Sequence, residues 1–199
     1  MPAKTPRYST DRQNLPKHSG TERRRMSANV GSEQLCLGFM ATLELEGRGH
    51  VGGLLVTNQS GRPLEFQCTT PVNPDRTQKI LYGPTLLPWL LGEVIGGTLL
   101  KRVAIKPEIV VIRDLALLEL RNHTETPVVC VTPNIDSEDS ESDSQSLGRH
   151  RLRFHAAHQG DSEILARQIH LVPGQADLEE PLDRVHEALG ETVKTVLAR

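Results

Sequence analysis

Aromatic residues are scarce in this sequence of 199 residues, since Phe, Trp and Tyr together make up only 3 % of it. A core built with so few of them must be aliphatic, and basic residues without interleaved aromatics offer no stacking platform for single-stranded nucleic acid. Cysteine is scarce too. Cys36, Cys68 and Cys130 lie far apart in apolar or strand-like contexts, which argues against a disulfide framework and indicates reduced, buried thiols. We therefore expect a cytoplasmic protein.

Long hydrophobic runs are also missing. The longest apolar stretch, Leu86 to Leu100, is only about fifteen residues and is interrupted by Glu93 and several glycines. The N-terminus carries charges and prolines but no apolar segment of the kind found in signal peptides. The sequence thus predicts neither a membrane span nor secretion, and no membrane partner.

Charge is distributed unevenly along the chain. The formal net charge of -2 is small, but residues 1–31 are rich in Lys and Arg, whereas residues 134–146 alternate Ser with Asp or Glu. Both stretches have too few aliphatic residues to offset the entropy lost on ordering. The near-neutral total argues against a dedicated nucleic-acid binder, so nucleic acid is not an expected partner, although the basic tail together with residues 149–153 leaves it open as a third possibility.

Composition divides the chain into four parts. We expect a disordered basic tail, a main α/β core, an acidic loop rich in Ser, Asp and Glu, and a C-terminal strand and helix that complete the same domain. Their residues are 1–31, 34–132, 133–147 and 148–199, respectively.

The core begins with a pattern of period two, which is typical of strands. Apolar residues alternate from Leu35 to Leu45, and the turn at Gly47–Gly49 leads into a second strand from His50 to Thr57. A second turn at residues 58–61 leads into a third alternating stretch, Pro63–Thr69. These signals predict a three-stranded antiparallel meander.

Helical spacing and buried strands follow the meander. Asp75 with Gln78 predicts a capped short helix, and the apolar positions of 85–100 surround most of a second helix. The C-terminal helix that begins near Asp177 is expected to cover the second face of that apolar helix. Two β-branched runs, 108–112 and 127–131, flank a helix capped by Asp114 and predict a β-α-β segment.

The predicted fold class follows from these elements. It is α+β, with an antiparallel meander extended by the β-α-β segment into a mixed sheet that packs against a central apolar helix and a C-terminal helix.

Three residues are candidates for ligand binding. Gly52 and Gly53 lie inside a strand, where glycine weakens the strand unless a bulge, a closely packed helix or a ligand requires it. Asp114 follows a buried strand at the end where open α/β sheets place binding crevices, although a plain helix cap explains it as well. The apolar helix offers an interaction surface made of Leu86, Trp89, Leu90 and Leu91.

No catalytic residue, metal site or cofactor is predicted. His150, His155 and His158 cannot be gathered on one face of a single strand or helix, so we expect no metal there. The cysteines carry no flanking catalytic motif, and the glycines match no nucleotide-binding fingerprint.

The sequence on its own therefore favours a non-enzymatic protein-binding or scaffold domain, with a protein partner or a homodimer. The alternative is a small hydrolase or nucleotide-handling enzyme that uses Asp114 and nearby histidines. A concave pocket of polar groups would favour the enzyme, and an exposed apolar patch would favour the scaffold.

Overall fold

The computed structural model describes residues 35–133, 144–147, 150–173 and 176–197. The expected basic tail, 1–31, lies outside these ranges, as does most of the expected acidic loop. The last part of that loop, Ser144–Leu147, forms strand β6 rather than a loop.

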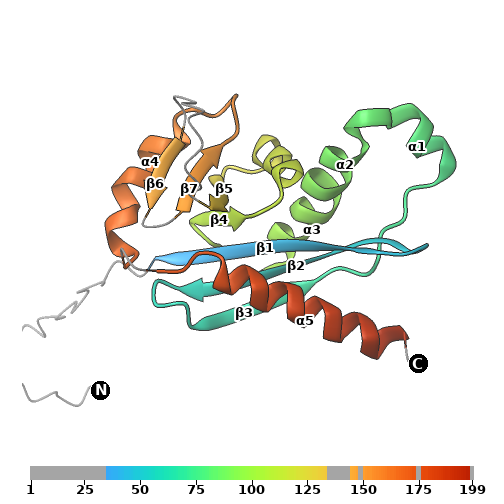
Figure 1. Cartoon of the computed structure of the whole chain (residues 1–199), viewed down its shortest axis with the longest axis horizontal. Helices are drawn as coiled ribbons and strands as arrows, with labels where there is room; N and C mark the ends of the chain where they lie inside the picture. The colour runs from blue at the N-terminus through green and yellow to red at the C-terminus, as the bar shows by residue number, and fades with distance from the viewer. Residues whose placement is uncertain (1–34, 134–143, 148–149, 174–175, 198–199) are drawn as a thin grey trace, which may run out of the picture. The chain divides into compact units, whose positions relative to one another are not determined.

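A mixed sheet of seven strands forms the centre of the fold, in the order β3-β2-β1-β4-β5-β7-β6 (Figure 1). Strands β1, β2 and β3 make the predicted antiparallel meander, and β4 and β5 run parallel to each other and to β1. This architecture confirms the predicted fold class. The strands are β1 Cys36–Leu45, β2 Gly49–Asn58, β3 Pro63–Cys68, β4 Ile109–Ile112, β5 Val128–Pro133, β6 Ser144–Leu147 and β7 His150–Phe154.

The turns of the meander form where the sequence predicts them. Gly47 and Gly49 take positive φ values between β1 and β2, as does Gly61 between β2 and β3. The side chain of Asn58 holds the second turn, because its Oδ1 accepts hydrogen bonds from the backbone N–H groups of Ser60 and Arg62.

Helical segments cover both faces of the sheet (Figure 1). On one face α5 packs over β1 and β2, with α4 nearby, and on the other lie α2, η2, α3 and η3. The helical segments are α1 Arg76–Tyr82, η1 Gly83–Thr85, α2 Leu86–Pro88, η2 Trp89–Gly96, α3 Gly97–Arg102, η3 Leu115–His123, α4 Asp161–Gln168, η4 Ile169–Leu171 and α5 Glu180–Leu197.

The apolar helix from Leu86 onward is covered differently from our expectation. Helix α5 lies on the opposite face of the sheet, so it cannot cover the second face of this helix. The 3-10 helix η3 covers it instead, because Gly92 and Gly96 leave room for Leu120 and its backbone to approach. The middle of the helix, η2, has π-helical geometry rather than the expected α-helical geometry.

The predicted interaction surface is wrong in its central residues. Leu90 and Leu91 are buried in the core between η2 and the sheet, while Leu86 and Trp89 are half-buried. The exposed apolar side chains of this region are Ile80 and Leu81 of the short helix α1, which projects away from the sheet (Figure 1), and Leu87 of α2. Within the described residues, no helix combines the length and apolar character that crossing a membrane requires.

Replacing Gly52 with alanine should destabilise the fold. A Cβ atom at Gly52 would overlap Ile95 of η2, so the helix would have to move away from the sheet. We expect a loss of about 1–3 kcal/mol in the free energy of unfolding, measured by urea denaturation. Gly190→Ala in α5 is the control: nothing lies within 4 Å of that position, and alanine there should stabilise the helix by up to about 1 kcal/mol. Equal stability of the parent and Gly52→Ala would contradict the close packing.

The carboxylate of Glu65 should make stability depend on pH. It accepts hydrogen bonds from the backbone N–H of Ile105, the side-chain amide of Gln67 and the backbone N–H of Ala104. These bonds, in that order of size, lower the pKa of Glu65 below its usual 4.5. Because the folded protein favours the ionised form, the stabilisation is present above pH 4.5 and is lost as the pH falls through the lowered pKa. Glu65→Gln should therefore lower Tm at pH 7, and the difference from the parent should shrink in acid. Glu46→Gln, at an exposed carboxylate, is the control, and a difference that is constant from pH 7 to pH 3 would refute this account.

Candidate metal centre

The glycines chosen from the sequence lie under helices and not at a ligand site. Gly52 faces Ile95 of η2, and a Cβ at Gly53 would lie 3.0 Å from Leu189 of α5. Close helix packing on both faces explains the two glycines and leaves no room for a ligand at either of them.

Asp114 serves as a helix cap. Its Oδ1 accepts a hydrogen bond of 2.9 Å from the backbone N–H of Ala116, at the start of η3. Among the residues that the structure describes, no histidine forms a hydrogen bond or ion pair with Asp114. The expected grouping of Asp114 with nearby histidines is therefore not formed.

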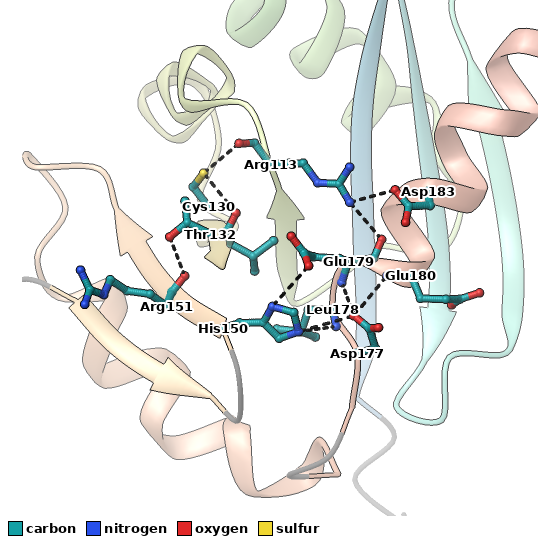
Figure 2. Close-up of polar contacts among 11 residues, drawn as sticks. Arg113, Cys130, Thr132, His150, Arg151, Asp177, Leu178, Glu179, Glu180 and Asp183 are labelled. Atoms are coloured by element: carbon teal, nitrogen blue, oxygen red, sulfur yellow. Dashed lines mark hydrogen bonds and ion pairs between the residues drawn. The ribbon is translucent and has the colours of Figure 1, made fainter. Parts of the chain in front are cut away.

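A different group of ionisable side chains meets beside the carboxyl ends of β4 and β5 (Figure 2). His150 is the first residue of β7 and pairs with Pro133, the last residue of β5. Asp177 and Glu179 precede α5, and the buried side chain of Leu178 between them anchors this segment in the core. The three residues bring one nitrogen and two carboxylates together from segments far apart in the sequence.

The geometry of this group is compact. His150 Nε2 lies 3.5 Å from Asp177 Oδ1, and His150 Nδ1 lies 3.9 Å from Glu179 Oε2. One potential ligand atom from each residue lies within 4.8 Å of the other two. The imidazole is only 1 % exposed, whereas the side chains of Asp177 and Glu179 are 40 % and 25 % exposed, so the group is open to solvent on its carboxylate side.

The buried imidazole has one nitrogen without a hydrogen-bond partner. The backbone N–H of Leu178 donates to Nε2 at 3.4 Å, but Nδ1 has no partner, and Glu179 is too far from it for a hydrogen bond. Leaving a buried polar atom unpaired costs about 1–3 kcal/mol. An unpaired ring nitrogen that faces a carboxylate indicates a place for a ligand of that nitrogen.

Two neighbouring side chains frame the group in Figure 2. Arg113, which follows β4, donates from Nη2 to Asp183 Oδ1 at 2.9 Å and to the backbone oxygen of Glu179 at 3.4 Å. It thereby fixes the start of α5. The thiol of Cys130 donates to the backbone oxygen of Arg113, and burial raises its pKa to about 11, so at neutral pH it is neither a thiolate ligand nor a nucleophile.

Sequence reasoning found only part of this group. It placed the start of the C-terminal helix near Asp177, whose Oδ1 accepts a hydrogen bond from the N–H of Glu179 at 3.0 Å, but it did not single out Glu179. The available signal was the Asp-Leu-Glu sequence of residues 177–179. Its two carboxylates flank an apolar residue, Leu178, that is buried and so anchors the segment.

The other two histidines considered for a metal lie elsewhere. Both contact Asn122 of η3: its Nδ2 is 3.3 Å from His155 Nε2, and its Oδ1 is 2.9 Å from His158 Nε2. Within the described part of the chain, these two histidines join no group of metal-ligand geometry. The expectation that His150, His155 and His158 hold no metal together stays a prediction, and the group formed by His150, Asp177 and Glu179 is a separate one.

Comparison with known proteins gives no family for this chain. No family model matches the sequence, and no curated protein matches it. Among similar solved structures are two of Ciona intestinalis Endonuclease V in complex with DNA containing an inosine followed by a ribo-adenosine, one of them the D234N form. They are 9 % and 10 % identical to this chain, with TM-scores of 0.43 and 0.44, and each match covers 83 % of this chain and 88 % of the other. Marinitoga piezophila Argonaute in complex with 5' OH guide RNA is 13 % identical, with a TM-score of 0.37, over 76 % of this chain and 29 % of that one.

These matches contradict two of the expectations drawn from the sequence. The sequence favoured a non-enzymatic protein-binding or scaffold domain with a protein partner or a homodimer, and it argued against nucleic acid. The similar structures are instead complexes with DNA or guide RNA, so both expectations are wrong. Similarity this distant assigns no role to any residue of this chain. The chemistry available to His150, Asp177 and Glu179 therefore follows from their own geometry.

The buried ion pair of Arg121 and Asp161 should be important for stability. Arg121 Nε lies 2.7 Å from Asp161 Oδ2 and Nη2 lies 3.1 Å from Oδ1, and the Asp161 side chain is 3 % exposed. Asp161→Ala should reduce the free energy of unfolding by about 3–5 kcal/mol, because it leaves the guanidinium buried and unpaired. In the control, Glu163→Ala removes an exposed partner of Arg167 and should change stability by less than about 1 kcal/mol. If urea denaturation shows the same decrease in the free energy of unfolding for both variants, the buried ion pair contributes no more to stability than the exposed one.

Proposed function

We propose that this chain is a metal-dependent hydrolase that binds one divalent cation through His150, Asp177 and Glu179. The observation that carries the proposal is the buried, unpartnered Nδ1 of His150, which faces a carboxylate. This hydrolase belongs to the class considered as the alternative from the sequence, but it uses these three residues in place of Asp114.

The hydrogen bonding of His150 leaves a lone pair on one nitrogen of its ring. The N–H of Leu178 donates to Nε2, which requires a lone pair on that nitrogen, and the distances to Asp177 and Glu179 exceed those of charge-assisted hydrogen bonds. Neutral imidazole is the form that binds metals. A cation at this place would be held by a ring nitrogen of His150 and by the carboxylates of Asp177 and Glu179.

The donor set limits the choice of cation. One imidazole nitrogen with carboxylate oxygens suits Zn²⁺ or Mn²⁺ better than a thiolate-preferring ion. Three protein ligands leave coordination positions for water, and a bound divalent cation can lower the pKa of such a water to about 7. A cation held by these residues would thus supply a nucleophile for hydrolysis at neutral pH.

The position in the fold supports the proposal as well. The group lies beside Arg113, which follows β4, and beside the last residue of β5. Open α/β sheets place ligands outside the carboxyl ends of their parallel strands, where loops bring side chains together. The partly exposed carboxylates give a cation a path into the group.

Metal binding tests the proposal directly. Protein without a histidine tag should bind about one Mn²⁺ or Zn²⁺ per chain in isothermal titration calorimetry. Glu179→Gln keeps the shape of the side chain but removes its charge, so it should weaken binding by about 10- to 100-fold. Glu187→Gln, an exposed change on α5, is the matched control and should bind like the parent. The melting temperatures without metal should stay within a few degrees of each other, because Glu179 is partly exposed.

Hydrolysis is measured with the same three proteins. Loaded with metal, the parent should hydrolyse at least one of p-nitrophenyl acetate, p-nitrophenyl phosphate and bis(p-nitrophenyl) phosphate, and Glu179→Gln should lose this activity. Absence of metal binding in the parent, or equal binding by Glu179→Gln, would overturn the metal site. Metal binding without hydrolysis of any of the three esters would overturn the hydrolase.

A further inference from the structure

A cleft of about 340 Å³ opens next to the metal centre. Asp177 lines the cleft and is also one of the proposed metal ligands, and Leu178 next to it lines the cleft as well. A molecule in the cleft would therefore lie against a proposed metal ligand. The cleft runs between the segment that leads into α5 and the adjacent ends of β1 and β2. Its lining comprises Leu37, Phe39, Thr57, Gln59, Ser60, Gly61, Val172, Pro173, Ala176, Asp177, Leu178, Glu180, Pro181 and Arg184.

The lining is apolar over most of its surface and polar at a few positions. Leu37, Phe39 and Val172 are buried residues of the core whose surfaces help to close the cleft. Gln59 and Ser60 contribute an amide and a hydroxyl at the β2 end. This combination suits a small organic molecule with an apolar body, since ligand pockets pair apolar walls with a few placed polar groups.

Arg184 brings a fixed guanidinium to the cleft. Its Nη2 donates to the backbone oxygen of Gly61 at 3.1 Å, and its Nε lies 3.1 Å from Glu180 Oε1. Both contacts hold the side chain against the cleft while it stays partly exposed. Nε and Nη2 take part in these contacts, and the remaining N–H groups of the guanidinium can donate charge-assisted hydrogen bonds to a phosphate oxygen.

The charges of the lining make anion binding depend on the metal. The charged residues that line the cleft are Asp177, Glu180 and Arg184, which sum to a net charge of -1. Glu179, the other carboxylate of the proposed metal centre, adds one more negative charge, and a divalent cation held by Asp177 and Glu179 brings the sum of these charges from -2 to 0. The metal therefore removes the net negative charge that repels an anion from the metal-free site and places a positive charge beside the cleft.

We propose, building on the proposed hydrolase, that the cleft binds a small phosphate monoester with an apolar organic group. The phosphate lies between the metal centre and Arg184, and the organic group lies against the apolar wall. In hydrolysis the oxygen of a water molecule forms the new bond to phosphorus and the bond from phosphorus to the ester oxygen breaks. The protons of the water end on the released alcohol and on the phosphate. A free nucleotide and the 5'-phosphorylated end of a nucleic-acid strand both offer this chemistry.

Ligand binding by the metal-loaded protein tests the proposal. AMP and phenyl phosphate should bind to the Mn²⁺-loaded parent and at least tenfold more weakly to the metal-free protein, whereas glycerol 3-phosphate, which lacks the apolar group, should bind weakly to both. Arg184→Gln should weaken AMP binding by about 10- to 100-fold, as expected for a lost charge-assisted contact, and leave Mn²⁺ affinity unchanged. Arg167→Gln, at an exposed arginine on α4, is the matched control. A 5'-phosphorylated oligonucleotide, compared with AMP, distinguishes a strand end from a free nucleotide as the source of the phosphate.

A second measurement needs no variant, which matters because Arg184 also holds the Gly61 turn. Bound Mn²⁺ should accelerate the ³¹P relaxation of AMP strongly, because the phosphate lies beside the ion. Excess phenyl phosphate should reverse the effect on AMP by competing for the cleft. Suppose that the parent binds Mn²⁺ and hydrolyses an ester. If Arg184→Gln then binds AMP as tightly as the parent, or if Mn²⁺ has no effect on the ³¹P relaxation of AMP, this inference is wrong and the proposed hydrolase is unaffected. Absence of Mn²⁺ binding in the parent would overturn the proposed function itself.

Discussion

Two adjacent glycines in β2 set the constraint on which the rest of the fold depends. Side chains alternate across a strand, so Gly52 leaves space on one face of the sheet and Gly53 leaves space on the other. Helix η2 fills the first space with Ile95, and α5 fills the second with Leu189. A helix therefore lies close on each face, and the aliphatic core is divided into two layers by the sheet.

Covering both faces also determines where chemistry can occur. With the faces of β1 and β2 buried, polar groups gather where strands end and helices begin, as at the carboxyl ends of β4 and β5. Arg113 fixes the start of α5 there, through Asp183 and the backbone of Glu179. The same contacts hold Asp177 and Glu179 beside the buried His150. The proposed metal centre and the cleft beside it are thus consequences of how α5 enters the fold.

Local signals were sufficient for much of the fold. The alternation of Leu35–Leu45, the glycines of the turns and the β-branched runs before and after η3 predicted the meander and the parallel pair correctly. The capping box of Asp75 and Gln78 also formed as predicted. These features depend on residues close in sequence, whose preferences are visible without knowledge of the rest of the chain.

The sequence by itself determined the strands of the meander and the two β-branched strands, the turns, the cap of α1 and the aliphatic character of the core. Only the tertiary structure decided which face of the sheet α5 covers, and that η3 rather than α5 packs on the apolar helix. It also decided that His150 joins Asp177 and Glu179, residues 27 and 29 positions later in the chain, instead of His155 and His158. The physical reason is the same in each case. The sequence shows that one face of an element is apolar, or that a side chain is of a type that can bind a ligand, but tertiary packing decides which distant segment contacts that face or that side chain.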